Sequence, residues 1–162
     1  MKNVSATYKG VITGALMILM SMCIFFLKGN FENQLQYVTY FIYIAGIVWT
    51  LIAYKRSSDE ERTFKNYFGQ GFKCFIVVTF MMVAFTWIFL KMNPGFRDDM
   101  AKNYRAELMK TGNKTPQEID TMVASAKEYF ITMLTSMAIF GYLLIGALVT
   151  LIASAFLSQN KK

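Results

Sequence analysis

Four long stretches of the chain contain no charged side chain, and every charge lies in the segments between them or at the two ends of the chain. These stretches cover residues 10–27, 33–54, 74–90 and 129–160. A helix needs about 20 predominantly apolar residues to cross a hydrocarbon core ~30 Å thick, and each stretch approaches or exceeds that length. The pattern predicts an all-α integral membrane protein in which residues 1–162 form a single membrane domain. Its four-transmembrane-helix bundle is expected to use residues 11–27, 35–54, 72–91 and 129–157.

The polar segment before the third predicted span has the pattern of an amphipathic helix. Ser58 is followed three residues later by Glu61, the spacing of a capping box that starts a helix. Large apolar side chains then recur at helical spacing, with cations on the other side. Because such a helix lies in the headgroup region, we predict an interfacial helix over residues 58–71, with a bend at Gly69 and Gly71. Its expected anchors are Phe64, Tyr67, Phe68, Phe72 and Lys73.

Residues 93–128 are the longest segment outside the predicted spans, and their pattern indicates two helices. The Asn-Pro-Gly sequence at 93–95 breaks the third span, and an apolar residue then recurs every four positions until Gly112 ends that helix. Thr115 and Glu118 form a second capping box, with a proline between them at the first helical position. No breaker follows, so we predict an extramembrane helical hairpin that is continuous with the fourth span.

The amino-acid composition of the chain excludes most catalytic mechanisms. The chain has no His, which excludes imidazole bases, imidazole-dependent triads and the commonest metal ligand. Its two cysteines, Cys23 and Cys74, have no metal-ligand spacing. The net charge of +7 comes without a nucleic-acid-binding motif and is assigned to segments beside the membrane. We therefore predict no enzymatic activity, no cofactor, no metal and no nucleic-acid partner, and we interpret the hairpin carboxylates as a solvated helix face.

Small residues at helical spacing mark places where helices can approach closely. They are Gly10 and Gly14 in the first span and Gly146, Thr150 and Ser154 in the fourth. They either close the internal bundle or bind a partner helix, and both alternatives stay open. We expect an accessory, scaffold or assembly subunit that acts by helix–helix association, with the lipid bilayer and either a second copy or a larger membrane complex as partners.

The alternative function is a small oligomeric transporter or channel for an unknown solute. Its polar path would have to use hydroxyl groups, because the spans contain no acid or base of the kind that marks proton relays. The hydroxyls in question belong to Thr79, Thr86, Thr132, Thr135 and Ser136.

Several short motifs together resemble those of a known family. They are Lys9-Gly10 with Gly14, residues 63–68 and 71–73, residues 103–105, residues 115–120 and residues 146–149. In these motifs the chain resembles the uncharacterised four-span inner-membrane proteins called domain of unknown function 4199, found mainly in Bacteroidota. The resemblance covers nearly the whole chain. It implies a membrane fold in the bacterial cytoplasmic (inner) membrane, and it implies no active residue.

The orientation expected in that membrane depends on the charges beside the spans. Cations divide almost evenly between the two sides, so the prediction relies on the short cationic termini and on the nearly neutral first turn. We expect the N and C termini in the cytoplasm and the hairpin at residues 93–128 in the periplasm.

Overall fold

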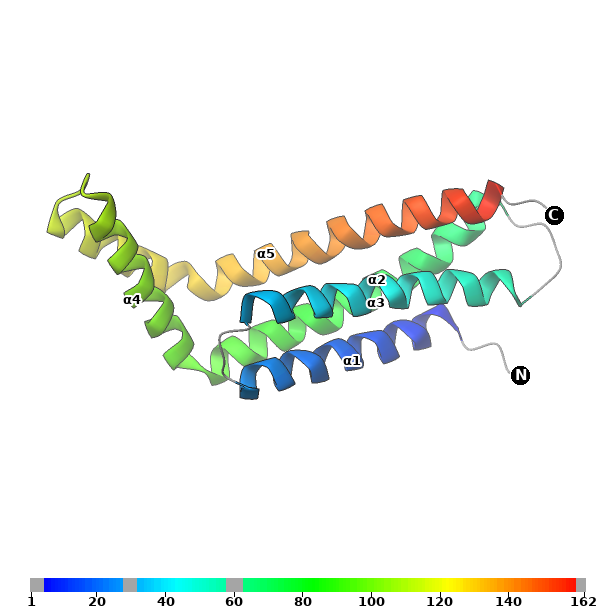
Figure 1. Ribbon diagram of the computed structural model, residues 1–162, viewed down its shortest axis with the longest axis horizontal. Coiled ribbons are helices and arrows are strands. Elements are labelled where there is room, and N and C mark those ends of the chain that lie inside the picture. Colours follow the sequence, from blue (N-terminus) through cyan, green and yellow to red (C-terminus); the bar gives the residue numbers. More distant parts are fainter. Residues whose placement is uncertain (1–4, 28–31, 58–62, 160–162) are drawn as a thin grey trace. The chain divides into compact units, whose positions relative to one another are not determined.

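The computed structural model describes residues 5–27, 32–57 and 63–159 (Figure 1). All regular structure in these residues is helical, which confirms the predicted fold class. The helices are α1 (Ala6–Leu27), α2 (Glu32–Lys55), α3 (Phe64–Met92), α4 (Pro94–Thr111) and α5 (Pro116–Gln159).

Four of these helices, α1, α2, α3 and α5, are long and apolar enough to cross a membrane. The segments that qualify are Ala6–Phe26, Tyr37–Lys55, Phe64–Met92 and Pro116–Gln159. Their length follows from the long runs without charge, because an apolar helix satisfies its own backbone hydrogen bonds and needs no water within the bilayer. The chain is therefore a multi-pass membrane protein with four candidate spans, as its sequence predicts.

Helices α3 and α5 extend beyond the spans expected within them. Helix α3 continues without interruption from Phe64 through Gly69 and Gly71, so these glycines do not separate an interfacial helix from a span. The capping box expected at Ser58 and Glu61 lies outside the described residues. Helix α5 contains 44 residues. Its length is about 66 Å by helical rise, more than twice the thickness of a ~30 Å hydrocarbon core.

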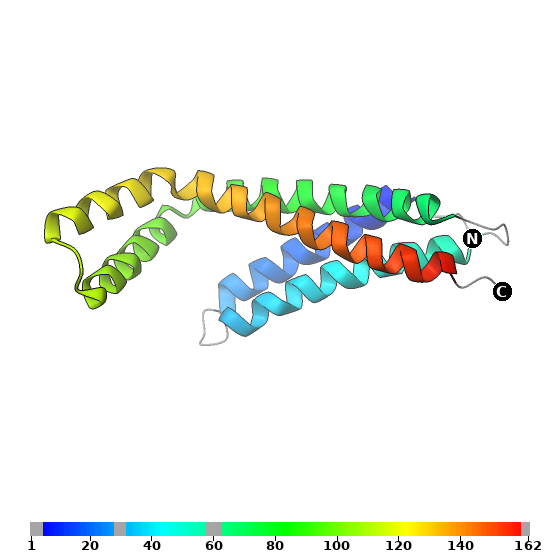
Figure 2. The same cartoon turned by 90° about the horizontal axis from the view of Figure 1, so that it is seen from above.

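The chain divides into two compact units: unit 1 comprises Met1–Met82 and Ile139–Lys162, and unit 2 comprises Val83–Ala138. In unit 1, helices α1 and α2, the first part of α3 and the last part of α5 lie side by side (Figures 1 and 2). The core between them includes side chains with no exposed surface: Met17, Tyr43, Ile47, Leu51, Cys74 and Val78.

Glycines allow the helices of unit 1 to approach closely. Thr13 of α1 lies where Gly46 of α2 has no side chain, and a Cβ built on Gly46 would be 2.9 Å from the Cβ of Thr13. Thr150 of α5 occupies the corresponding space at Gly71 of α3. Since lipid is as apolar as the helix surfaces, association inside a membrane depends on this close packing.

In unit 2, α4 folds back along the first part of α5 as an antiparallel hairpin (Figure 1). The rings of Phe96 and Phe130 meet across it, with centroids 6.2 Å apart. Helix α4 ends at Gly112, whose φ of 65° is left-handed and favours a residue without a Cβ. The chain reversal is therefore specified by its own turn residues, as the sequence predicts.

Candidate functional site

Two ion pairs join the helices of the hairpin. Arg105 Nη2 lies 2.7 Å from Asp120 Oδ1, and Lys127 Nζ lies 2.8 Å from Asp98 Oδ1. All four side chains are about half exposed, and exposed pairs of this kind contribute little to stability because water screens them. Their larger effect is geometric, because two pairs separated along the helices fix the register of α4 against α5.

The hairpin carboxylate nearest the start of α4 is electrostatically perturbed. The hydrogen-bonded ammonium of Lys127 holds the pKa of Asp98 below its ordinary value, and the charge of Arg97 acts in the same direction. Asp98 is therefore ionised at neutral pH, and the ion pair with Lys127 is present there.

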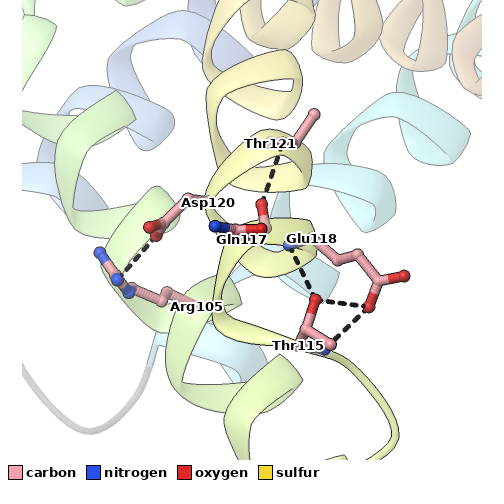
Figure 3. A network of polar contacts seen from close by, with 6 residues as sticks. All are labelled: Arg105, Thr115, Gln117, Glu118, Asp120 and Thr121. Atoms are coloured by element: carbon pink, nitrogen blue, oxygen red, sulfur yellow. Dashed lines mark hydrogen bonds and ion pairs between the residues drawn. The ribbon is translucent and has the colours of Figure 1, made fainter.

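The capping box predicted at the start of α5 is present (Figure 3). The backbone N–H of Thr115 donates to Glu118 Oε2 over 2.8 Å, and the N–H of Glu118 donates to Thr115 Oγ1 over 3.4 Å. Two amides that the first turn would leave unpaired are satisfied in this way. Figure 3 also shows Asp120, on the next turn, reaching the Arg105 guanidinium of α4. The capped start of α5 and the ion pair that joins α5 to α4 are therefore adjacent.

A cavity of about 260 Å³ opens between the two helices of the hairpin, and we call it the hairpin groove. It is lined by Arg97, Met100, Ala101 and Tyr104 of α4 and by Ala126, Lys127, Phe130 and Met133 of α5. Arg97 and Lys127 are the charged members of this lining. Arg97 makes no ion pair with any described residue, whereas Lys127 is held by Asp98. The groove thus combines an apolar floor with an exposed guanidinium.

The five small residues expected to mediate helix packing lie inside unit 1: Gly10, Gly14, Gly146, Thr150 and Ser154. A Cβ added to Gly10 would lie 2.8 Å from the backbone oxygen of Cys74 in α3. One added to Gly146 would meet the Tyr43 hydroxyl of α2. These residues therefore face other helices of their own chain, which is the first of the two alternatives that the sequence left open.

The expected interfacial anchors fall into two groups in the structure. Tyr67 is 5% exposed and packs against Tyr54 of α2, with ring centroids 5.7 Å apart. The other four are partly or fully exposed on α3: Phe64, Phe68, Phe72 and Lys73. Tyr67 is thus buried within unit 1, and membrane anchoring stays a prediction for all five residues.

Several polar side chains are buried in unit 1, and among them the burial of Lys9 was not predicted from the sequence. Lys9 is 8% exposed, and its Nζ lies 5.7 Å from the centroid of the Trp49 ring. The hydroxyls of Thr150 and Ser154 have no hydrogen-bond partner in the described part of the chain. The available signal for Lys9 was its helical spacing, because it lies four residues before Thr13 on the face that packs against α2.

The hydroxyl residues considered for a polar path are divided between the two units. Thr79 is buried in unit 1. The remaining residues, Thr86, Thr132, Thr135 and Ser136, belong to unit 2. The structure therefore does not assemble these five hydroxyls as one path within either unit.

One family model matches the chain over residues 8–159, and the family is described as "protein of unknown function (DUF4199)". The match includes nearly all of the described helices, from the first turn of α1 to the end of α5. No curated protein and no solved structure matches the chain.

Proposed function

The chain belongs to the DUF4199 family, and on the basis of its own residues we propose that it is an accessory, scaffold or assembly subunit of the bacterial inner membrane that acts by helix–helix association. The main support for this proposal is the ordered helical hairpin of unit 2. Its two helices are held by cross-helix ion pairs and by a capped turn. A surface that is already ordered loses little conformational freedom when a partner binds, so such a hairpin is suited to recognition.

The proposal contains no catalytic step. The hairpin supplies carboxylates, but Asp98 and Asp120 are each engaged by a cation on the opposite helix. The pKa of Asp98 is lowered by Lys127, and a carboxylate whose ionised form is stabilised in this way is a poor general base. This pairing supports a structural role for both residues.

In the orientation we propose, both termini face the cytoplasm and the hairpin faces the periplasm. Its support is the cationic character of the short terminal segments beside their spans. The hairpin would then meet the periplasmic parts of other membrane proteins, or a second copy of this chain.

Photo-crosslinking in native membranes tests the association role and distinguishes two contact surfaces. A photoreactive residue at Met109, which is 55% exposed on α4, reports contacts of the hairpin. One at Phe140, which is 74% exposed on α5 in unit 1, is the matched probe for lateral contact within the bilayer. We expect a discrete protein adduct at Met109. If neither position yields an adduct, and purification in mild detergent recovers no stoichiometric partner or second copy, the association role is wrong.

One observation favours the alternative function as a transporter. The hydroxyls of Thr150 and Ser154 are fully buried in unit 1 without a partner in the described residues, and buried polar groups within membrane helices often line solute paths. Saturable solute flux in liposomes that falls in Thr150→Val would support transport. This substitution removes the hydroxyl and nearly preserves the shape of the side chain. The absence of flux across a broad solute panel would leave the association role as the better proposal.

A further inference from the structure

We propose that the hairpin groove binds one anionic phospholipid, with part of an acyl chain in the groove and the phosphate at Arg97. This site is independent of the association role, since it requires a lipid and no protein partner. The proposal depends on the lining of the groove, on its place relative to the apolar runs of the sequence, and on its unpaired cation.

The lining suits a hydrocarbon chain. Six of its eight residues are alanine, methionine or aromatic side chains. Sites for drug-sized ligands typically measure about 300–1,000 Å³, so a cavity of about 260 Å³ accepts a short length of chain and is too small for a folded peptide segment. Methionine side chains also adapt readily to a flexible hydrocarbon.

Both walls of the groove come from residues at the edge of an apolar run. On α5, Lys127 and Glu128 are the last charged residues before the uncharged stretch, and Phe130 and Met133 lie just inside it. On the α4 side, Arg97 follows shortly after Lys91, which ends the apolar run of α3.

A side-chain contact at the end of α3 also indicates that these residues lie at the depth of the lipid headgroups. Lys91 Nζ lies 4.0 Å from the centroid of the Trp87 ring, and both residue types are characteristic of the membrane surface. The groove therefore belongs to residues at headgroup depth, where a phospholipid presents its phosphate above its acyl chains.

The charge at the groove is complementary to a phosphate. Arg97 is exposed and has no ion-pair partner among the described residues, and a guanidinium can hold phosphate oxygens in a bidentate manner. Helix α4 has no acidic residue in its first turn, and its N-cap residue Asn93 makes no capping bond. Instead, the Asn93 amide donates to the backbone oxygen of Phe89 in α3. The positive end of the α4 dipole thus lies close to Arg97, and the nearest carboxylate, that of Asp98, is already paired with Lys127.

Lipid titration of the purified full-length chain, followed by native mass spectrometry, tests the headgroup part of the proposal. The probes are phosphatidylglycerol, which is anionic, and phosphatidylcholine with identical acyl chains. One cation near a membrane surface favours an anionic lipid by about fivefold, so we expect a single phosphatidylglycerol to bind about fivefold more tightly than phosphatidylcholine. Arg97→Gln should abolish this preference. Lys102→Gln is the matched control, because Lys102 is an exposed cation of α4 that does not line the groove.

A second pair of variants tests the acyl-chain part. Ala126 lines the groove, so Ala126→Leu should fill it and prevent binding of both lipids. Ala124 is exposed on the same helix outside the groove, so Ala124→Leu should bind both lipids as the unchanged protein does. Helicity measured by circular dichroism checks that both variants fold. Inorganic phosphate at millimolar concentration should not displace phosphatidylglycerol, because it has no chain to fill the groove.

The lipid site would be overturned by equal affinity for the two lipids, by full phosphatidylglycerol binding of Ala126→Leu, or by displacement of the lipid by inorganic phosphate. A protein or second copy released from the groove by Ala126→Leu, with lipid binding unchanged, would also overturn it, since the occupant would then be a polypeptide. If neither Met109 nor Phe140 yields a crosslinked adduct and no stoichiometric partner or second copy co-purifies, while the lipid still binds, the association role alone is contradicted.

Discussion

Gly46 of α2 is the position where the smallest possible substitution should disturb unit 1 most clearly. Adding the methyl group of alanine would bring its carbon against Oγ1 and Cγ2 of Thr13 and to within 2.9 Å of the Thr13 Cβ. Thr13 is 2% exposed, and its hydroxyl donates to the backbone oxygen of Lys9 over 2.9 Å. The methyl group therefore has to push α1 away from α2 or rotate Thr13 out of that hydrogen bond.

The expected cost follows from two opposing effects. Overpacking of a close contact typically costs about 1–3 kcal/mol, while replacement of glycine by alanine inside a helix returns up to about 1 kcal/mol through helix propensity. For Gly46→Ala we expect the free energy of unfolding to fall by about 1–2 kcal/mol. The matched control is Gly141→Ala on α5, because a Cβ there meets no atom within 4 Å. That variant should be neutral or slightly more stable.

Reversible unfolding of the purified protein in mixed detergent micelles measures both free energies. Thr13→Ala removes the two atoms nearest to the new methyl group, so in the Gly46→Ala background it should recover part of the loss. The double-mutant cycle should give a favourable coupling of about 1 kcal/mol. Equal stability of Gly46→Ala and Gly141→Ala, or a coupling near zero, would refute the close approach of α1 and α2.

Three further predictions concern the hairpin. Thr115→Ala removes the hydroxyl that accepts from the N–H of Glu118 and should cost about 1 kcal/mol, seen as faster amide exchange in the first turn of α5; unchanged exchange would contradict it. The pKa of Asp98 is lowered by Lys127, so the ion pair is present above the ordinary aspartate range and is lost as the pH falls through the lowered value. In Lys127→Met, carboxyl NMR should show Asp98 titrating at higher pH, and an unchanged titration would remove Lys127 as the cause. A cysteine at Asn113 should react with an impermeant reagent in intact cells and one at Ser57 should not; the opposite result would reverse the proposed orientation.

Structural features that depend only on residues close together in the sequence could be predicted from the sequence. Each apolar helix is specified by the absence of charge over a length that the bilayer requires. The capping box at Thr115 and the left-handed Gly112 are specified within a few residues, because a helix end must satisfy its own backbone groups. These signals do not depend on which other helix lies nearby, so they predict the elements and their ends.

Structural features that depend on packing against a second helix could not be predicted from the sequence in the same way. Lys9 resembles an ordinary flanking cation, and its burial follows from packing of its face against α2, where Trp49 lies. Tyr67 is an interior residue because Tyr54 lies opposite it. The hairpin groove depends on the register of α4 against α5, and the sequence analysis interpreted the carboxylates that fix this register as a solvated helix face. Such contacts require the positions of both partners.

The position of the small residues changes where an interaction surface should be sought. Gly10 and Gly146 face Cys74 and Tyr43 of their own chain, so a bulky side chain at either glycine would disturb unit 1 before it could report on a partner. Loss of a partner from such a variant would therefore not distinguish recognition from misfolding. Substitutions at Met109 or Arg97 avoid this ambiguity, because both side chains are exposed and neither belongs to the core of unit 1. The hairpin is consequently the part of the molecule in which binding can be tested separately from folding of the membrane bundle.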